Sequence, residues 1–240
     1  MHPKDVKSLQ LNNTRNSGET VGMEVTFYTD PLCCWTWAMQ SQWKKFLDDD
    51  LQRFRPVVKY KMGGLLPSWK HFYDSTNSIR KPVQMGPEWM HARAISGAVI
   101  NDRIWITDPP ASSFPACIAV KCAEFQSPSI TEHFLNLLQE AVMVKNMNIS
   151  RSDIILEVAS ALPTAFPDFD FGKFKEDLFG ERAKDAFRKD LHECKYLNIT
   201  RMPTILFKAL NRHSVLVTGY QTYESLKNVC IKMEDGNPKP

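Results

Sequence analysis

The alternation of apolar and polar residues predicts a strand, a helix and a second strand near the start of the chain. The runs "MEVTFY" at 23–28 and "RPVVKYKM" at 55–62 place apolar side chains at alternate positions, as in a half-buried strand. Between them, apolar residues recur at the spacing of one helix face: Trp35, Met39, Trp43, Phe46 and Leu47. A helix of this length can connect two strands that pair in parallel.

A second group of strands is predicted near the end of the sequence. The runs "PTILF" at 203–207 and "SVLVTGY" at 214–220 are rich in β-branched and apolar residues, and a short polar segment separates them. This pattern is typical of an antiparallel hairpin. A helix is predicted after it, because Leu226, Val229, Cys230 and Met233 share one helix face.

The intervening region, 63–197, has the pattern of helices broken by glycine- and proline-containing loops. Pro87 is predicted at the first position of one helix, and Ser129 with Glu132 has the spacing of a capping box for another. The predicted buried positions are Phe134, Leu138, Ala141 and Val142 in that helix, and Ala183, Phe187, Leu191 and Cys194 in a later one. The region is therefore expected to be all-helical.

The order of elements predicts an α/β protein with a thioredoxin-like fold, βαβ…ββα, and a large all-helical insertion. The expected segments are a flexible N-terminal extension 1–21, the first part of the thioredoxin-like domain 22–66, the insertion 67–197, the second part of the domain 198–235 and a flexible tail 236–240.

Composition excludes several classes of protein. A formal net charge of +3 is too small to indicate a nucleic-acid or membrane partner. The polar start lacks the apolar core of a secretory signal, and no run approaches the roughly 20 apolar residues of a membrane span. We therefore expect a cytoplasmic protein, in which six cysteines are too few for a disulfide framework.

The candidate chemistry lies in "FYTDPLCCWTWAMQ", residues 27–40, where two cysteines stand between the first strand and the first helix. A helix N-terminus favours a thiolate and can lower its pKa, which makes Cys33 the candidate nucleophile. The hydroxyl of Thr36, one turn further on, is placed to donate a hydrogen bond to that thiolate. Cys34 is either an alternative resolving thiol or a partly buried helix residue, and the second interpretation is the stronger.

The segments "FYTDPLCCWTWAM" and "ITRMPTILF" resemble the DsbA-like branch of the thioredoxin superfamily. The resemblance is to its cytoplasmic group of predicted dithiol-disulfide isomerases, which includes relatives of FrnE and of a ClpXP adaptor. It implies that Cys33 is the nucleophilic cysteine and Pro203 the cis-proline. It also implies a substrate groove beside Trp35, Met202, Pro203 and Thr204. The family's second cysteine is replaced by Thr36, so the motif is C-x-x-T and cannot form the usual bridge.

Three functions fit this pattern. The first is a thiol-disulfide oxidoreductase or isomerase with one active cysteine, whose mixed disulfide an outside thiol such as glutathione resolves. The second is a glutathione-dependent transferase or isomerase. The third is a non-enzymatic adaptor that binds another protein. We favour the first, with protein or small-molecule thiols and disulfides as partners. No tightly bound cofactor is expected, and no metal, because no cysteine or histidine pair has ligand spacing.

Overall fold

The structure is a computed structural model that describes residues 23–54, 57–209 and 214–234. The predicted extension 1–21 and tail 236–240 lie outside these ranges. Within the described ranges, no helix combines the length and the apolar character that crossing a bilayer requires.

Four strands form one sheet in the order β2-β1-β3-β4. Their bounds are β1 (Met23–Thr29), β2 (Val57–Met62), β3 (Thr204–Ala209) and β4 (Ser214–Thr218). Strands β1 and β2 pair in parallel, whereas β3 pairs antiparallel with both β1 and β4. The predicted strand-helix-strand unit and the predicted hairpin are both confirmed.

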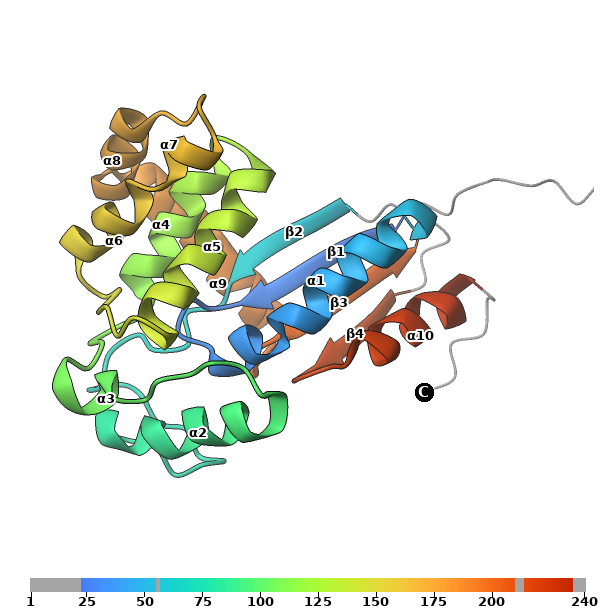
Figure 1. The fold of residues 1–240 in the computed structure, drawn as a ribbon, viewed down its shortest axis with the longest axis horizontal. Coiled ribbons are helices and arrows are strands. Elements are labelled where there is room, and N and C mark those ends of the chain that lie inside the picture. The colour runs from blue at the N-terminus through green and yellow to red at the C-terminus, as the bar shows by residue number, and fades with distance from the viewer. Residues whose placement is uncertain (1–22, 55–56, 210–213, 235–240) are drawn as a thin grey trace, which may run out of the picture.

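Helices cover both faces of the sheet. The alternation in β1 turns Val25 and Phe27 to the face covered by α1 (Cys34–Phe54) and α10 (Tyr223–Glu234), where Phe27 stacks on Trp43 with ring centroids 4.8 Å apart (Figure 1). Tyr28 points to the opposite face and packs with Cys194 of α9 (Glu181–Tyr196). The fold is thus the predicted α/β thioredoxin-like fold.

The regular secondary structure between β2 and β3 is helical, apart from one isolated bridge between Asp74 and Ile79. Its helices, besides α9, are η1 (Pro82–Gln84), α2 (Met85–Ser96), α3 (Ile104–Thr107), α4 (Phe114–Glu124), α5 (Pro128–Met143), α6 (Ser152–Ala159), α7 (Leu162–Ala165) and α8 (Phe171–Phe179). They gather beyond the ends to which β1 and β2 point (Figure 1). The apolar faces predicted for α5 and α9 are buried or half-buried.

Two predicted helix starts are wrong. Helix α2 begins at Met85, so Pro87 is its third residue rather than its first. Helix α5 begins at Pro128, and its N-cap is Ser127, whose side chain accepts a hydrogen bond from the backbone N–H of Ser129. Proline at the first helical position needs no intrahelical partner, which moves the cap two residues upstream of the predicted Ser129. The capping box with Glu132 is therefore not formed.

Candidate functional site

The two-cysteine segment forms a tight turn between β1 and α1. The backbone N–H of Cys33 donates to the carbonyl of Asp30 at 2.9 Å, and the carbonyl of Cys33 accepts from the N–H of Trp37 at 3.2 Å. Cys33 therefore immediately precedes α1, at the end where unpaired backbone N–H groups point outward. This is also the carboxyl end of two parallel strands, where open α/β sheets place their ligand sites.

A distant segment closes over the Cys33 thiol. The Sγ of Cys33 donates to the carbonyl oxygen of Met202 at 3.4 Å, although 169 residues separate them in the sequence. The Met202–Pro203 peptide bond is cis, as the resemblance implies. The Met202 side chain lies against Gly63, where any Cβ would collide with it. Together these contacts leave the Cys33 residue only 4% exposed.

Two buried threonines extend behind the thiol. Thr29 Oγ1 donates to Thr36 Oγ1 at 2.9 Å, which leaves the Thr36 hydroxyl proton for another acceptor. A hydrogen bond from this hydroxyl to the Cys33 sulfur lowers the thiol pKa, as do the backbone N–H groups of Thr36 and Trp35. The Thr36 hydroxyl therefore lies where it can donate to the Cys33 sulfur.

The pKa of Cys33 itself departs from the sequence-based expectation. The pKa of the thiol is raised to about 11, mainly by burial and additionally by the negative charge of Asp30. The lowering effects of the helix start and Thr36 are real but smaller than the cost of placing a thiolate in a desolvated site. The expected lowering assumed an exposed helix start, whereas Met202 covers this one.

The other predicted residues fall into different environments. Cys34 is buried in the main hydrophobic core, and burial raises its pKa well above the ordinary value, so it is an apolar helix residue. Thr204 is buried, and its hydroxyl donates to the carbonyl of Arg201 at 2.7 Å. The structure therefore brings together Cys33, Thr36, Met202 and Pro203, and directs Cys34 and the Thr204 hydroxyl elsewhere.

Asp30 is a residue that the sequence analysis missed. Its fully buried carboxylate accepts from the N–H of Leu32 at 2.8 Å, the N–H of Leu65 at 2.6 Å, the hydroxyl of Ser113 at 2.7 Å and the thiol of Cys117 at 3.3 Å. Burial raises the pKa of Asp30, and these hydrogen bonds oppose that rise. An Asp-Pro pair directly before a helix is a turn signal that could have drawn attention to it.

Trp35 has partners that no local sequence signal could reveal. Its indole Nε1 donates to Glu88 of α2 at 2.6 Å, and its ring makes edge contacts with His91 and with Tyr220 of the segment before α10. The half-buried Trp35 thus joins the start of α1 to the helical insertion and to the end of the sheet.

The remaining cysteines do not extend the site. Cys117, Cys122, Cys194 and Cys230 are buried free thiols, as predicted for core residues. Among the described residues, no group of three or more His, Cys, Asp and Glu side chains is arranged to hold a metal ion.

A reduced cysteine at the start of α1, facing the carbonyl before a cis-proline on a β2-β1-β3-β4 sheet, defines a DsbA-like protein of the thioredoxin class. The family model described as Thioredoxin matches residues 27–228, and the chain belongs to this family.

Known proteins similar to the chain include adapters and disulfide-active proteins. The ClpXP adapter protein SpxH of Halalkalibacterium halodurans is 26% identical over 90% of this chain and 69% of its own length. A putative protein disulfide isomerase from Nitrosomonas europaea superimposes with a TM-score of 0.74 at 16% identity, over 89% of this chain and 98% of its own. The cytosolic disulfide reductase DsbM of Pseudomonas aeruginosa with GSH gives a TM-score of 0.65 at 15% identity, over 88% and 99% of the two chains.

Proposed function

We propose that the protein is a cytoplasmic thiol-disulfide oxidoreductase or isomerase in which Cys33 is the single nucleophile and an external thiol, such as glutathione, resolves the mixed disulfide. The observation that carries the proposal is the contact between the Cys33 thiol and the Met202 carbonyl at the start of α1. It combines a thiol, a helix N-terminus and a backbone acceptor at one point. An extended substrate can pair with such a backbone group.

The reaction balances without a second protein cysteine. The Cys33 thiolate attacks one sulfur of a substrate disulfide, which forms a mixed disulfide and releases the other substrate sulfur as a thiol. The thiolate of glutathione then attacks the substrate sulfur of the mixed disulfide and returns Cys33 to the reduced state. The substrate leaves with a glutathione disulfide, which a further exchange can reduce or isomerise. Thr36 cannot take part in the bond exchange and serves as hydrogen-bond donor to the Cys33 sulfur.

Substrate binding supplies a way to activate a thiol whose pKa is raised. In the substrate-free site the thiol proton is donated to the Met202 carbonyl, which favours the protonated form. A substrate backbone N–H that donates to this carbonyl removes the stabilisation of the protonated thiol. The Thr36 hydroxyl still stabilises the thiolate. The proposal thus expects slow reaction with small alkylating agents and faster reaction with a bound peptide disulfide.

The test compares Cys33→Ser with Cys34→Ser in the exchange of a glutathionylated peptide, with glutathione present. Cys33→Ser is expected to reduce the exchange to the uncatalysed rate, and Cys34→Ser to retain it within about threefold, because Cys34 lies in the core. Mass spectrometry is expected to find the trapped mixed disulfide on Cys33. Unchanged exchange by Cys33→Ser would overturn the proposal.

The burial of Cys33 favours a second candidate function, a protein-binding adapter without redox chemistry. A thiol that is 4% exposed, with a pKa of about 11, is a weak nucleophile at neutral pH. The similarity to SpxH, a ClpXP adapter, over 90% of this chain supports the same interpretation. Under this alternative, Cys33→Ser leaves protein binding intact, and the purified protein stimulates degradation of a bound partner by ClpXP while it shows no disulfide exchange.

A further inference from the structure

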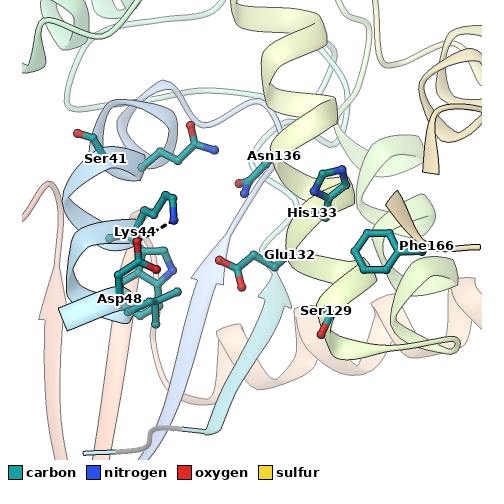
Figure 2. A pocket seen from close by; sticks show the side chains of 11 residues that line it. Ser41, Lys44, Asp48, Ser129, Glu132, His133, Asn136 and Phe166 are labelled. Atoms are coloured by element: carbon teal, nitrogen blue, oxygen red, sulfur yellow. Dashed lines mark hydrogen bonds and ion pairs between the residues drawn. The ribbon is translucent and has the colours of Figure 1, made fainter. Parts of the chain in front are cut away.

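The surface away from the thiol site includes a polar cleft whose charged groups already have partners. This cleft, of about 590 Å³, lies between α1 and α5 (Figure 2). Lys44 pairs there with Asp48 at 2.7 Å, and Glu132 forms a hydrogen bond with the buried Tyr60. The edge strand β4 differs, because some of its backbone hydrogen-bonding groups point away from the sheet.

Strand β4 lies at the edge of the described sheet, with β3 as its neighbour (Figure 1). The N–H of Gly219, directly after β4, donates to the carbonyl of Pro203, directly before β3, at 2.7 Å. In an antiparallel ladder, residues that bond to the neighbouring strand alternate with residues that do not. Counting back from the residue after β4, the N–H and C=O groups of Thr218, Leu216 and Ser214 therefore point to the open edge.

The middle residue of this open edge is apolar and exposed. Leu216 is 48% exposed, and its N–H and C=O have no hydrogen-bond partner among the described residues. It lies directly opposite the half-buried Leu206 of β3, which packs with Tyr28 on the sheet face away from α1. The carbonyl of Thr218, in contrast, accepts from the side chain of Gln221 at 3.2 Å. The unsatisfied part of the edge is thus centred on Leu216.

The two edges of the sheet are protected differently. Strand β2, at the opposite edge, carries Lys59 and Lys61, and lysines on an edge strand oppose pairing with another chain. Lys61 also pairs with Asp190 and Glu193 of α9, at 2.9 and 3.3 Å. Strand β4 has the sequence SVLVT, which contains neither a charged residue nor proline. Its sequence therefore does nothing to prevent the addition of a further strand.

The sequence of β4 also indicates which strand fits this edge. Read in either direction, SVLVT gives a small hydroxyl residue, a valine, a leucine, a valine and a small hydroxyl residue. An antiparallel strand from a second copy, centred on Leu216, therefore matches like with like at every position. Ser214 faces Thr218 of the copy, and Val215 faces Val217 of the copy. Hydroxyl pairs and pairs of β-branched residues stabilise neighbouring strands, and no like charges meet.

We propose that β4 pairs with β4 of a second copy of the protein, antiparallel about a two-fold axis at Leu216, so that two four-stranded sheets join into one. The outward N–H and C=O of Leu216 bond to those of Leu216 in the second copy. Leu206 and Leu216 of both copies then form one apolar row across the joined sheet. Because the contact uses one short strand from each chain, we expect a weak dimer with a Kd of roughly 10–100 µM.

The dimer is tested by sedimentation velocity of the full chain between about 1 and 500 µM, under reducing conditions because the cysteines are free thiols. We expect the weight-average sedimentation coefficient to rise from the monomer value toward the dimer value. A chain that is monomeric at about 500 µM would overturn the proposal and leave the edge to a strand of another protein.

Hydrogen exchange of the wild type locates the contact. The N–H of Leu216 is expected to exchange more slowly as the protein concentration rises, because it becomes hydrogen-bonded in the dimer. The N–H of Val217 bonds to β3 in both states and should show no such change. A dimer in which the exchange of the Leu216 N–H does not depend on concentration would use another surface, and the proposal would be wrong.

Charge substitutions at Leu216 test the two-fold axis. Leu216→Lys and Leu216→Glu each place two like charges opposite each other, so each variant alone is expected to associate at least about tenfold more weakly than the wild type. An equal mixture of the two should regain the dimer, because a lysine then faces a glutamate. Ile106→Lys changes a residue that is 71% exposed on α3, and this matched control should dimerise as the wild type does. A mixture that associates no better than either variant alone would contradict the register.

The proposed dimer is independent of the proposed thiol chemistry. Cys33→Ser is expected to associate as the wild type does, so the loss of disulfide exchange and the loss of association can be told apart. Circular dichroism reports whether the Leu216 variants keep the fold. If either variant does not fold, the concentration dependence of Leu216 exchange in the wild type still decides whether β4 forms the contact.

Discussion

At the scale of single residues, the Cys33 thiol is subject to opposing effects. Burial and the charge of Asp30 raise its pKa, whereas the Thr36 hydroxyl and two backbone N–H groups lower it. The hydroxyl of Thr29 orients that of Thr36, so the chain of hydrogen bonds ends on the sulfur. The motif C-x-x-T therefore has a hydrogen-bond donor at the position where the DsbA-like resemblance implies a second cysteine, and it cannot form a disulfide there.

Replacing Thr36 tests this donor. Thr36→Val keeps the shape but removes the hydroxyl, so the pKa of Cys33 is expected to rise above about 11 and alkylation at pH 8 to slow by about fivefold. Thr36→Ser, which retains the hydroxyl, should restore the wild-type rate. The measurement is the rate of labelling at Cys33, located by mass spectrometry. A faster rate in Thr36→Val than in Thr36→Ser would show that the hydroxyl does not stabilise the thiolate.

Asp30 is expected to make stability depend on pH. Because burial raises its folded-state pKa above the ordinary value, protonation is more favourable in the folded chain than in the unfolded chain. The resulting stabilisation is fully present below the unfolded pKa and is lost as pH rises through the folded pKa. Asp30→Asn removes this pH-dependent contribution. The free energy of unfolding of the variant should therefore increase relative to that of the wild type as pH rises from about 4 to 8.

Urea unfolding of both proteins across this range measures the difference. The control is Ser113→Ala, which removes one hydrogen-bond donor to Asp30 but retains the carboxylate. Its free energy of unfolding should therefore still depend on pH. If the free energies of unfolding of Asp30→Asn and the wild type differed by the same amount at every pH, the expected pH dependence would be contradicted.

At the scale of elements, α5 shows how a helix start is set by its neighbours. Pro128 occupies the first helical position, and Ser127 before it satisfies the N–H of Ser129. This arrangement leaves Ser129 exposed and releases Glu132 to face α1. The sequence contains two serines near the start of this helix, and pattern alone selected the wrong one because Glu132 stands three residues after Ser129.

The cap can be tested by a matched pair of substitutions. Ser127→Ala is expected to lower the free energy of unfolding by about 1 kcal/mol, because it removes the cap acceptor. Ser129→Ala, two residues away and exposed, should change it by less than about 0.5 kcal/mol. Chemical denaturation measures both values. A larger loss in Ser129→Ala than in Ser127→Ala would reinstate the capping box that the structure does not contain.

At the scale of the whole molecule, a buried ion-pair network joins the helical insertion to the sheet. Asp190 of α9 accepts from Lys121 of α4 at 2.8 Å, from Lys61 of β2 at 2.9 Å and from the N–H of Met62 at 3.1 Å. Lys121 also pairs with Glu124. Both Lys121 and Asp190 are buried, so each charge depends on the other partners for compensation.

Breaking this network should cost far more than breaking a surface pair. Lys121→Met leaves the buried Asp190 with one cation fewer and is expected to destabilise the fold by about 3 kcal/mol. Lys145→Met, which removes an exposed pair with Glu140, should cost less than about 1 kcal/mol. Thermal or urea unfolding of the two variants measures the contrast. Similar losses in both would show that the buried network contributes no more than a surface ion pair.

The sequence predicted the parts of this molecule that depend on local periodicity. The strands, the long first helix and the hairpin follow from alternation and helical spacing within short windows. Three of the four donors to Asp30 could not be predicted, because Leu65, Ser113 and Cys117 are distant from it in the sequence. The raised pKa of Cys33 was missed for the same reason, since its burial involves Met202 from the far end of the fold.

The 169-residue separation between Cys33 and Met202 also has a consequence during protein synthesis. Ribosomes add about 5–20 residues per second, so roughly 10–30 s pass between emergence of the thiol and emergence of the segment that buries it. During that interval the nascent chain presents Cys33 with the pKa of an ordinary cysteine, about 8.5. We expect ribosome-bound chains halted before residue 202 to be alkylated at Cys33 much faster than the released protein. Translation is therefore the period in which Cys33 is most exposed to oxidation.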